Sequence, residues 1–373
     1  MAAVVFIIIL SVLVLAHELG HFVAAKRSGI RVEEFGLGIP PRIIGKKIGE
    51  TLYSINLLPF GGFNRITGED YSDKKAAKNP RSFISKTPLV RAKVLIAGVA
   101  LNFVLATVLY YIFFFATGFK TFHMPLYFDY SFKFGNTNGV NTVVSGFIPD
   151  TPISDLSIKY SEAIVAINGT KVFTVEDVRE AVSGLENEEV TLDLVDLRSD
   201  LRRTVKTTTT FDEDGTSILG VYLSEAVQIR YTTPVEKVFS GFLHAYNISG
   251  YSFHSLSKII SLSVKSRDIS PVSQTVAGPV GIYTVVNAIL DYKDINVVLS
   301  LIDFTALLSL SLAILNLLPF PALDGGRLLF VLIELVTKGK KVNREFEARL
   351  HSIGMALLLL LLLVITFKDI FLR

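Results

Sequence analysis

The sequence lacks cysteine, which excludes a disulfide framework and leaves only nitrogen and oxygen ligands for any metal site. It also lacks a large net charge: the formal charge is +3, so charge does not indicate a nucleic-acid partner. There is no internal repeat and no low-complexity linker. Half of the 373 residues are hydrophobic and the mean hydropathy is +0.49. That is too apolar for an ordinary soluble protein and indicates a membrane protein.

Four stretches are apolar over about the 20 residues that a helix needs to cross a bilayer. They are residues 1–24, 92–116, 297–319 and 350–367. The first stretch has the composition of a signal peptide, but its basic flank, Lys26 and Arg27, comes after it rather than ahead of it. We therefore expect an uncleaved span with its N-terminus outside.

The basic residues are concentrated in two segments. Residues 22–93 hold 14 Lys and Arg against 6 Asp and Glu, and residues 325–354 hold 6 against 3. The positive-inside rule places both segments in the cytoplasm. With four spans, both termini and the acidic middle of the chain then lie outside.

The middle of the chain, about residues 121–225, is polar and contains alternating stretches such as EVTLDLVDL. This pattern predicts half-buried strands in a soluble α+β domain. Residues 234–262 alternate at helical spacing and predict either an amphipathic helix on the membrane surface or a helix packed on the domain. We expect an N-terminal membrane domain at 1–120 and a C-terminal part, with this helix, at 226–373.

The stretch LAHELGHFVAAK ends the first span and contains His17, Glu18 and His21. On a helix the two histidines lie one turn apart on one face, so their imidazoles can bind one ion. Zinc lowers the pKa of a bound water toward ~7, and Glu18 can take the proton. Three ionisable groups within a membrane segment are costly, which favours a functional role over a chance HExxH.

A catalytic zinc takes three protein ligands. The remaining histidines are His123, His244, His254 and His351. Of these, only His351 lies near the cytoplasmic side. Asp324 in NLLPFPALDGGRLLF is the better candidate, because Pro319 and Pro321 should break the third span near its cytoplasmic end. Asp324 could instead be only the cap of the helix that follows.

The pairing of HELGH with NLLPFPALDGG resembles the site-2 protease family of intramembrane zinc metalloproteases, and most closely the bacterial regulator of sigma-E protease branch. Four further stretches resemble the family in the same order: EFGLG (34–38), NLLPFGGFNRITGED (56–70), FISKTPLVRAKVLIAGVALNF (83–103) and AGPVGIY (277–283). The resemblance implies a polytopic α-helical membrane protein of about four transmembrane helices. It also implies a membrane-associated β-hairpin and an inserted extracytoplasmic α+β PDZ domain.

The resemblance also implies roles for particular residues. His17, His21 and Asp324 would ligate zinc, and Glu18 would be the general base. Asn316 and Pro319 would hold the substrate near the metal, and Asn102, in the Gly-x-x-x-Asn pattern that begins at Gly98, would support the site. Alternatively, Asn316 only satisfies the helix break and Asn102 only joins two helices.

The β-hairpin at about 52–66 would pair with the substrate as an added strand. A helix hides its peptide bonds, so it must be unwound before water can attack, and an open edge strand can hold it extended.

The stretch GFIPDTPISDLSIKYSEAIVAINGTKV (146–172) resembles the core of a PDZ domain. It departs from the family at Asp155-Leu156, where Gly-Leu is usual, and at Ser161-Glu162, where Gly-Asp is usual. A fold survives such changes more readily than ligand binding does. We therefore expect the domain to filter substrates by size above the active site rather than to capture a peptide C-terminus.

The sequence thus predicts an intramembrane zinc endopeptidase of the bacterial cytoplasmic membrane. Its substrates would be single-span proteins, such as anti-sigma factors, or signal-peptide remnants already shortened outside. One alternative is an inactive scaffold that binds partners through its PDZ domain, which the complete metal set argues against. Another is a transporter that uses the broken helix, which the absence of repeats argues against. Asp303 within the third span could pack against a helix or line a water path.

Overall fold

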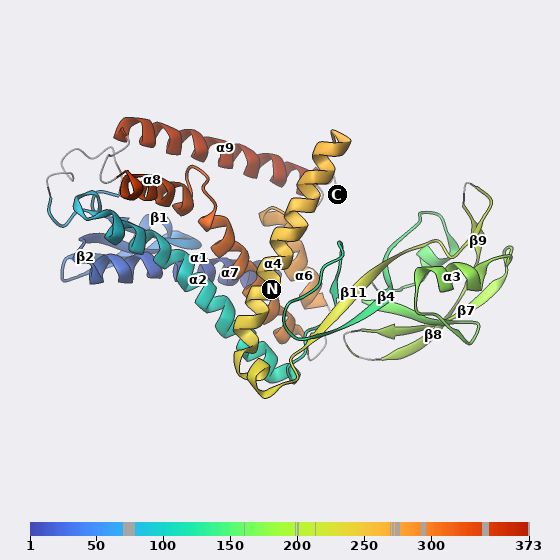
Figure 1. The fold of residues 1–373 in the computed structure, drawn as a ribbon. Helices are drawn as coiled ribbons and strands as arrows, with labels where there is room; N and C mark the ends of the chain where they lie inside the picture. Colours follow the sequence, from blue (N-terminus) through green and yellow to red (C-terminus); the bar gives the residue numbers. More distant parts are fainter. Residues whose placement is uncertain are drawn as a thin grey trace. The chain divides into compact units, whose positions relative to one another are not determined.

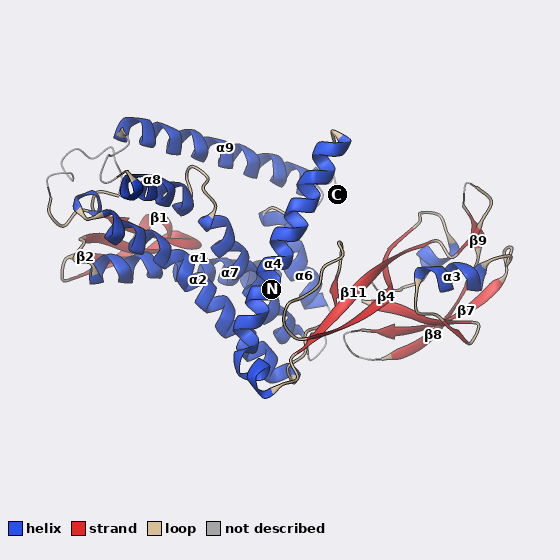
Figure 2. Cartoon of the chain, in the orientation of Figure 1, coloured by secondary structure: helices blue, strands red, loops and turns tan. Residues whose placement is uncertain are grey.

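The computed structural model describes residues 1–69, 79–159, 161–197, 199, 201–212, 214–268, 270, 272, 277–291, 296–337 and 343–371. The chain divides into two compact units (Figures 1 and 2). The first comprises Met1–Phe113, His244–Ser249 and Ile259–Arg373, and the second comprises Phe114–Leu243 and Gly250–Lys258. The first unit holds the long apolar helices, and the second holds the large sheet.

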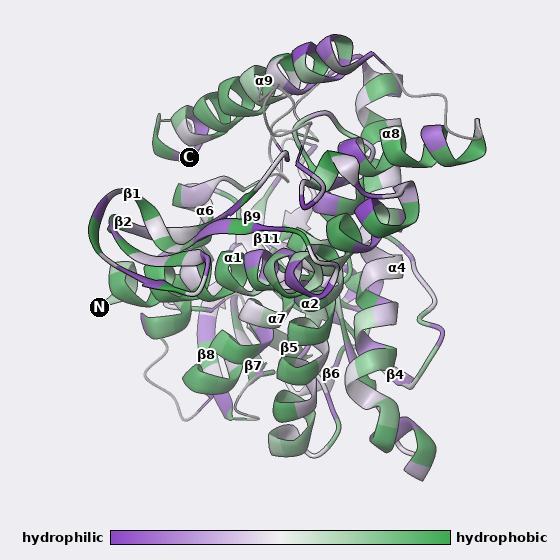
Figure 3. Ribbon diagram, turned by 90° about the vertical axis from the view of Figure 1, so that its left-hand side faces the viewer, coloured by the Kyte–Doolittle hydropathy of each residue, from purple (hydrophilic) through white to green (hydrophobic). Residues whose placement is uncertain are grey.

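All four predicted apolar helices are present, and each is long and apolar enough to cross a membrane. They are α1 (Ala2–Arg27), α2 (Pro88–Thr117), α7 (Val297–Leu317) and α9 (Arg344–Phe371). Figure 3 shows α9 as mainly apolar, with hydrophilic residues toward its ends. Only 6% of the apolar window of α9 is buried, against 28–33% in the other three. Packing therefore fixes α9 less than it fixes the other spans.

The break between α7 and α8 (Asp324–Val336) lies where the two prolines predicted it. Helix α7 ends at Leu317 because Leu318, which precedes Pro319, is extended. The chain then reverses through Ala322, whose φ is +81°, and α8 begins at Asp324. The loop thus delivers Asp324 to the first turn of a helix.

Helix α4 (Pro234–Ser266) confirms that residues 234–262 are helical. It starts at a reciprocal cap, in which the Glu236 N–H donates to the Thr233 hydroxyl and the Thr233 N–H donates to the Glu236 carboxylate. Its location on a membrane surface stays a prediction.

Strands β1 (Val32–Ile48) and β2 (Thr51–Ile66) form an antiparallel sheet whose pairing differs from the predicted hairpin. Phe35 pairs with both Tyr53 and Asn64, so residues 34–37 lie between the two halves of β2. The two arms of the β-hairpin predicted at about 52–66 therefore do not pair directly with each other, because residues 34–37 lie between them. Both strands reverse direction along their length. Gly61, at φ +73°, lies where β2 reverses.

The reversal of β2 lies against the apolar part of α1. The Ser11 hydroxyl donates to the Pro59 carbonyl at 2.7 Å. A Cβ on Gly61 would stand 2.9 Å from Val14, so the turn fits against α1 only with glycine there. The sheet is thus fastened to the helix that carries HELGH.

The second unit is built on one mixed-length antiparallel sheet of order β3-β11-β4-β5-β7-β8, with β6 beside β5. The strands are β3 (Met124–Pro125), β4 (Asn136–Phe147), β5 (Glu162–Ile167), β6 (Thr170–Lys171), β7 (Glu189–Asp196), β8 (Arg202–Thr208) and β11 (Val221–Arg230). Strands β9 (Thr210–Phe211) and β10 (Ser217–Ile218) pair separately, and α3 spans Val175–Val182. The alternation in β7 holds as predicted, since Val190, Leu192 and Leu194 are fully buried.

The boundary predicted at residue 225 falls inside β11, because this strand continues to Arg230. The division into parts 1–120, 121–225 and 226–373 remains a prediction.

The AGPVGIY stretch opens α6 (Pro279–Asp291), and its glycines bind a carboxylate. The N–H groups of Gly278 and Gly281 each donate to the buried Asp369 of α9 at 2.9 Å. A Cβ on Gly281 would stand 3.0 Å from that carboxylate. A carboxylate at a helix N-terminus is favourable, so this contact attaches the end of α9 to α6.

Arg91 at the start of α2 forms an ion pair with Glu334 of α8, and both side chains are almost fully buried. Around them pack apolar residues that include Leu95, Leu328 and Val331. The pair therefore joins α2 to the helix that begins with Asp324.

We predict that Arg91→Leu lowers the free energy of unfolding by about 3 kcal/mol, because it leaves a buried carboxylate without its partner. Unfolding in mixed detergent micelles measures this. Arg91→Leu combined with Glu334→Leu should recover most of the loss. Arg179→Leu removes an exposed ion pair and should change little. Native stability of Arg91→Leu would contradict the assignment.

Candidate active site

Three side chains from opposite ends of the chain converge in the first unit. His17 Nε2 and His21 Nε2 lie 2.9 and 3.0 Å from Asp324 Oδ2, and 3.1 Å from each other. All three side chains are mostly buried, at 10%, 10% and 16% exposed. The structure thus brings HELGH and LDGG together across 303 residues.

The donor set fits a zinc ion. Two imidazole nitrogens and one carboxylate oxygen are ligands that zinc accepts. Zinc–ligand bonds of ~2.0–2.1 Å in a tetrahedron separate ligand atoms by ~3.3 Å. The observed separations of 2.9–3.1 Å are a few tenths of an ångström shorter, which small side-chain rotations can supply. Three protein ligands leave one position for water, as in catalytic zinc sites.

The far nitrogen of each imidazole is oriented by a second group. His21 Nδ1 lies 2.8 Å from the Val94 carbonyl and donates its proton there. His17 Nδ1 lies 3.4 Å from the Asn102 side-chain nitrogen, while the buried Asn102 Oδ1 has no partner in the part of the chain described. Turning the Asn102 amide by 180° lets Oδ1 accept from His17 Nδ1–H. Both Nε2 lone pairs are then free for one metal ion.

Gly98 on α2 makes room for these rings. A Cβ at Gly98 would collide with the His21 imidazole and stand 2.9 Å from His17 Cε1. Gly20 of α1 in turn backs directly onto the Ala97–Gly98 backbone. The Gly-x-x-x-Asn pattern therefore supplies close helix approach at Gly98 and a polar partner at Asn102, one turn later.

Glu18 follows His17 on α1 and is half-buried. It lies within electrostatic range of His21, Asp324 and Arg327. Arg327, one turn after Asp324 on α8, pairs with Glu69 at the end of the small sheet. A carboxylate is therefore placed beside the three converging ligands, as the sequence predicted.

Asn316 and Pro319 flank the end of α7. Asn316 is half-buried in the last helical turn, and Pro319 is exposed in the loop that leads to Asp324. The roles of both residues toward substrate stay predictions.

The glycines of LDGG are required by packing. A Cβ at Gly325 or Gly326 would collide with carbonyl groups of the preceding loop, at Leu317 and Phe320. His351 of α9 also contacts this loop: its Nδ1 accepts from the Ala322 N–H at 2.9 Å. The three ligand atoms that converge belong to His17, His21 and Asp324, and not to His351, the rival candidate for the third ligand.

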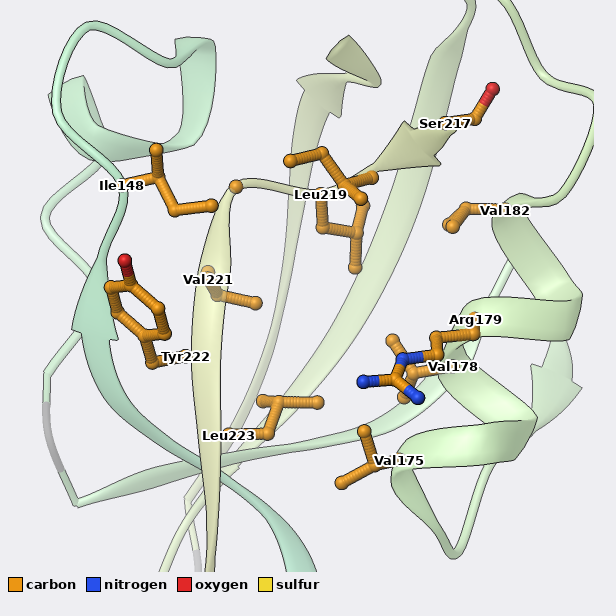
Figure 4. A pocket seen from close by; sticks show the side chains of 12 residues that line it. Ile148, Val175, Val178, Arg179, Val182, Ser217, Leu219, Val221, Tyr222 and Leu223 are labelled. Atoms are coloured by element: carbon orange, nitrogen blue, oxygen red, sulfur yellow. The ribbon is translucent and has the colours of Figure 1, made fainter. Parts of the chain in front are cut away.

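The second unit contains an apolar groove of about 310 Å³ between α3 and the segment 217–223 (Figure 4). Its lining is Ile148, Val175, Val178, Arg179, Val182 and residues 217–223. Val221 and Leu223 pair with β4 along one edge and direct their side chains into the groove. The side chains that line the groove are mostly apolar.

Comparison with known proteins identifies the family. Residues 5–361 match peptidase family M50. The chain belongs to peptidase family M50. This confirms the site-2 protease resemblance, and with it the enzyme class, a zinc metalloprotease.

Several bacterial relatives span almost the whole of this M50 peptidase. A Clostridium perfringens protein, provisionally named a zinc metalloprotease, is 32% identical over 96% of each chain. The regulator of sigma-W protease RasP of Bacillus subtilis is 29% identical over 98% of this chain and 97% of that protein. The PDZ domain of an SdrC-like protein from Listeria monocytogenes overlaps 22% of this chain and 86% of its own, at 18% identity and a TM-score of 0.20. That score is too low to establish the fold of the second unit.

We predict that the native M50 peptidase, purified in detergent, holds one zinc per chain and that Asp324→Ala loses it or binds it far more weakly. Removing one of three ligands leaves two imidazoles, which hold zinc poorly. Elemental analysis measures the stoichiometry. Asp291→Ala, which removes a carboxylate on α6, is the matched control and should retain zinc. If Asp324→Ala still holds one zinc per chain, another residue is the third ligand.

Proposed function

We propose that this M50 peptidase is an intramembrane endopeptidase in which His17, His21 and Asp324 hold zinc and Glu18 is the general base. The observation that carries the proposal is the convergence of the three ligand atoms within 4.8 Å of one another beside Glu18, on a helix apolar enough to span a membrane. Burying such a group of ionisable side chains is costly, and metal binding offsets that cost.

The chain's own residues prepare the site for hydrolysis. Bound zinc would polarise the scissile carbonyl and acidify its water. Glu18 is the residue that would accept a proton from the attacking water and return it to the leaving amine. Val94 and Asn102 hold the two imidazoles in the tautomer that leaves Nε2 free.

The substrate must be extended before its backbone can be cut. Within the part of the chain described, residues 62–65 of β2 pair on one side only, with residues 34–37. This edge begins beside Val14 and Leu15 of α1, close in sequence to His17. An unwound segment can add to it as a further strand, while Asn316 and Pro319 hold it near the metal.

The substrates we propose are single-span membrane proteins, including anti-sigma factors, and signal-peptide remnants. The relative named regulator of sigma-W protease supports the first class. We place both termini and the second unit, as a PDZ domain, outside the cytoplasmic membrane, because the basic segments 22–93 and 325–354 favour the cytoplasm. The zinc metalloprotease class argues against the alternative of a catalytically inactive scaffold.

Glu18→Gln should retain zinc and lose cleavage of a single-span substrate by at least ~10²-fold, because the amide cannot accept the proton. Cleavage in proteoliposomes and zinc content on the same preparation measure both. Glu176→Gln, an exposed change on α3, serves as the control. Cleavage near the native rate in Glu18→Gln would rule out this residue as the base.

The groove of the second unit supports an additional function, the capture of an extended apolar segment of the substrate. Its apolar lining along Val221 and Leu223 favours capture over a purely steric role.

We expect Val175→Lys to raise KM for a single-span substrate without lowering kcat, because this half-buried residue lines the groove and the added charge leaves the metal site intact. Steady-state cleavage kinetics measure the two constants. Phe173→Lys, an exposed residue before α3 that does not line the groove, is the control. An unchanged KM in Val175→Lys would leave the second unit with the steric role alone.

A further inference from the structure

The loop that delivers Asp324 contains a strained residue. Ala322 has φ +81°, a conformation uncommon for residues other than glycine. Such a conformation is unfavourable and persists only when the surroundings fix it. The surroundings of Ala322 therefore contribute to the position of the carboxylate two residues later.

Helix α9 supplies those surroundings. His351 Nδ1 lies 2.9 Å from the Ala322 nitrogen, and since that nitrogen donates, Nδ1 must be the unprotonated acceptor. The Phe330 ring of α8 packs edge-on at 6.0 Å and limits rotation of the imidazole. Gly354, one turn along α9, lies so close to Pro321 that a side chain there would collide with it.

The hydrogen bond between His351 and Ala322 matters for the position of α9, because the rest of the protein buries little of this helix. With 6% of its apolar window buried, packing alone does little to hold the helix against the loop. The acceptor on His351 is a directional contact between this span and the loop. It reaches the backbone at the strained residue itself.

We propose that His351 is a positioning residue for the zinc site: by accepting the Ala322 N–H it fixes the turn that aims Asp324 at His17 and His21. The role rests on the proposed function, and it is distinct from zinc ligation, because the ligand atoms that converge belong to His17, His21 and Asp324 and not to His351. Groups that orient a metal ligand typically change metal affinity or activity by ~10–100-fold when removed.

The test compares His351→Leu with His351→Asn. Leucine removes the acceptor, whereas the asparagine oxygen stands close to the place of Nδ1. We expect His351→Leu to weaken zinc affinity and kcat by ~10–100-fold. His351→Asn should stay near the native protein in both, with one zinc per chain. Zinc affinity is measured by competition with a chelator, and kcat with a single-span substrate in proteoliposomes.

Ser352→Leu, an exposed change at the next position on α9, is the control for added apolar bulk. If His351→Leu fails to fold, His351→Gln replaces it, because its oxygen extends toward the position of Nε2 and misses the Ala322 N–H. If His351→Leu, or His351→Gln in its place, keeps the zinc affinity and kcat of the native protein, the proposal is wrong. A defect in His351→Asn equal to that in His351→Leu would also overturn it.

The same measurements separate this proposal from the proposed function. A native protein without zinc defeats both. A native protein with one zinc and an unaffected His351→Leu defeats only the positioning role. Loss of zinc from His351→Asn, with retention in Asp324→Ala, would make His351 the third ligand instead.

Discussion

The structure of the first unit depends on one requirement, that two imidazoles and one carboxylate meet inside an apolar protein. His17, His21 and Asp324 stand about 3 Å apart, and polar groups buried in an apolar protein are costly unless they bind a cation or one another. The neighbouring features follow from this requirement. Helices α1 and α2 approach closely because Gly20 and Gly98 lack side chains.

The support for these ligands comes from backbone groups and small residues more than from bulky packing. Val94 offers a carbonyl to His21, and the glycines of LDGG let α8 start against the loop. The buried ion pair between Arg91 and Glu334 likewise joins α2 to α8. Each contact fixes a direction, which apolar side chains in lipid cannot do.

The sequence predicted the parts of this structure that are local. Hydropathy located the four spans, helical spacing paired His17 with His21, and two prolines located the break before Asp324. It did not predict which strands pair, because alternation along residues 52–66 does not reveal that residues 34–37 lie between its halves. It also missed Asp369, whose partners lie 88 and 91 residues away, and the contact of His351 with Ala322. Those contacts depend on tertiary placement that no local pattern carries.

The distance of 303 residues between His21 and Asp324 has a consequence for the newly made protein. At ~5–20 residues per second, a ribosome needs roughly 15–60 s to reach Asp324 after it has completed HELGH. For most of that interval the first two spans have been made, but the third proposed ligand has not. On the proposed ligand set, the protein could bind zinc with all three ligands only after the loop between α7 and α8 has packed against α1.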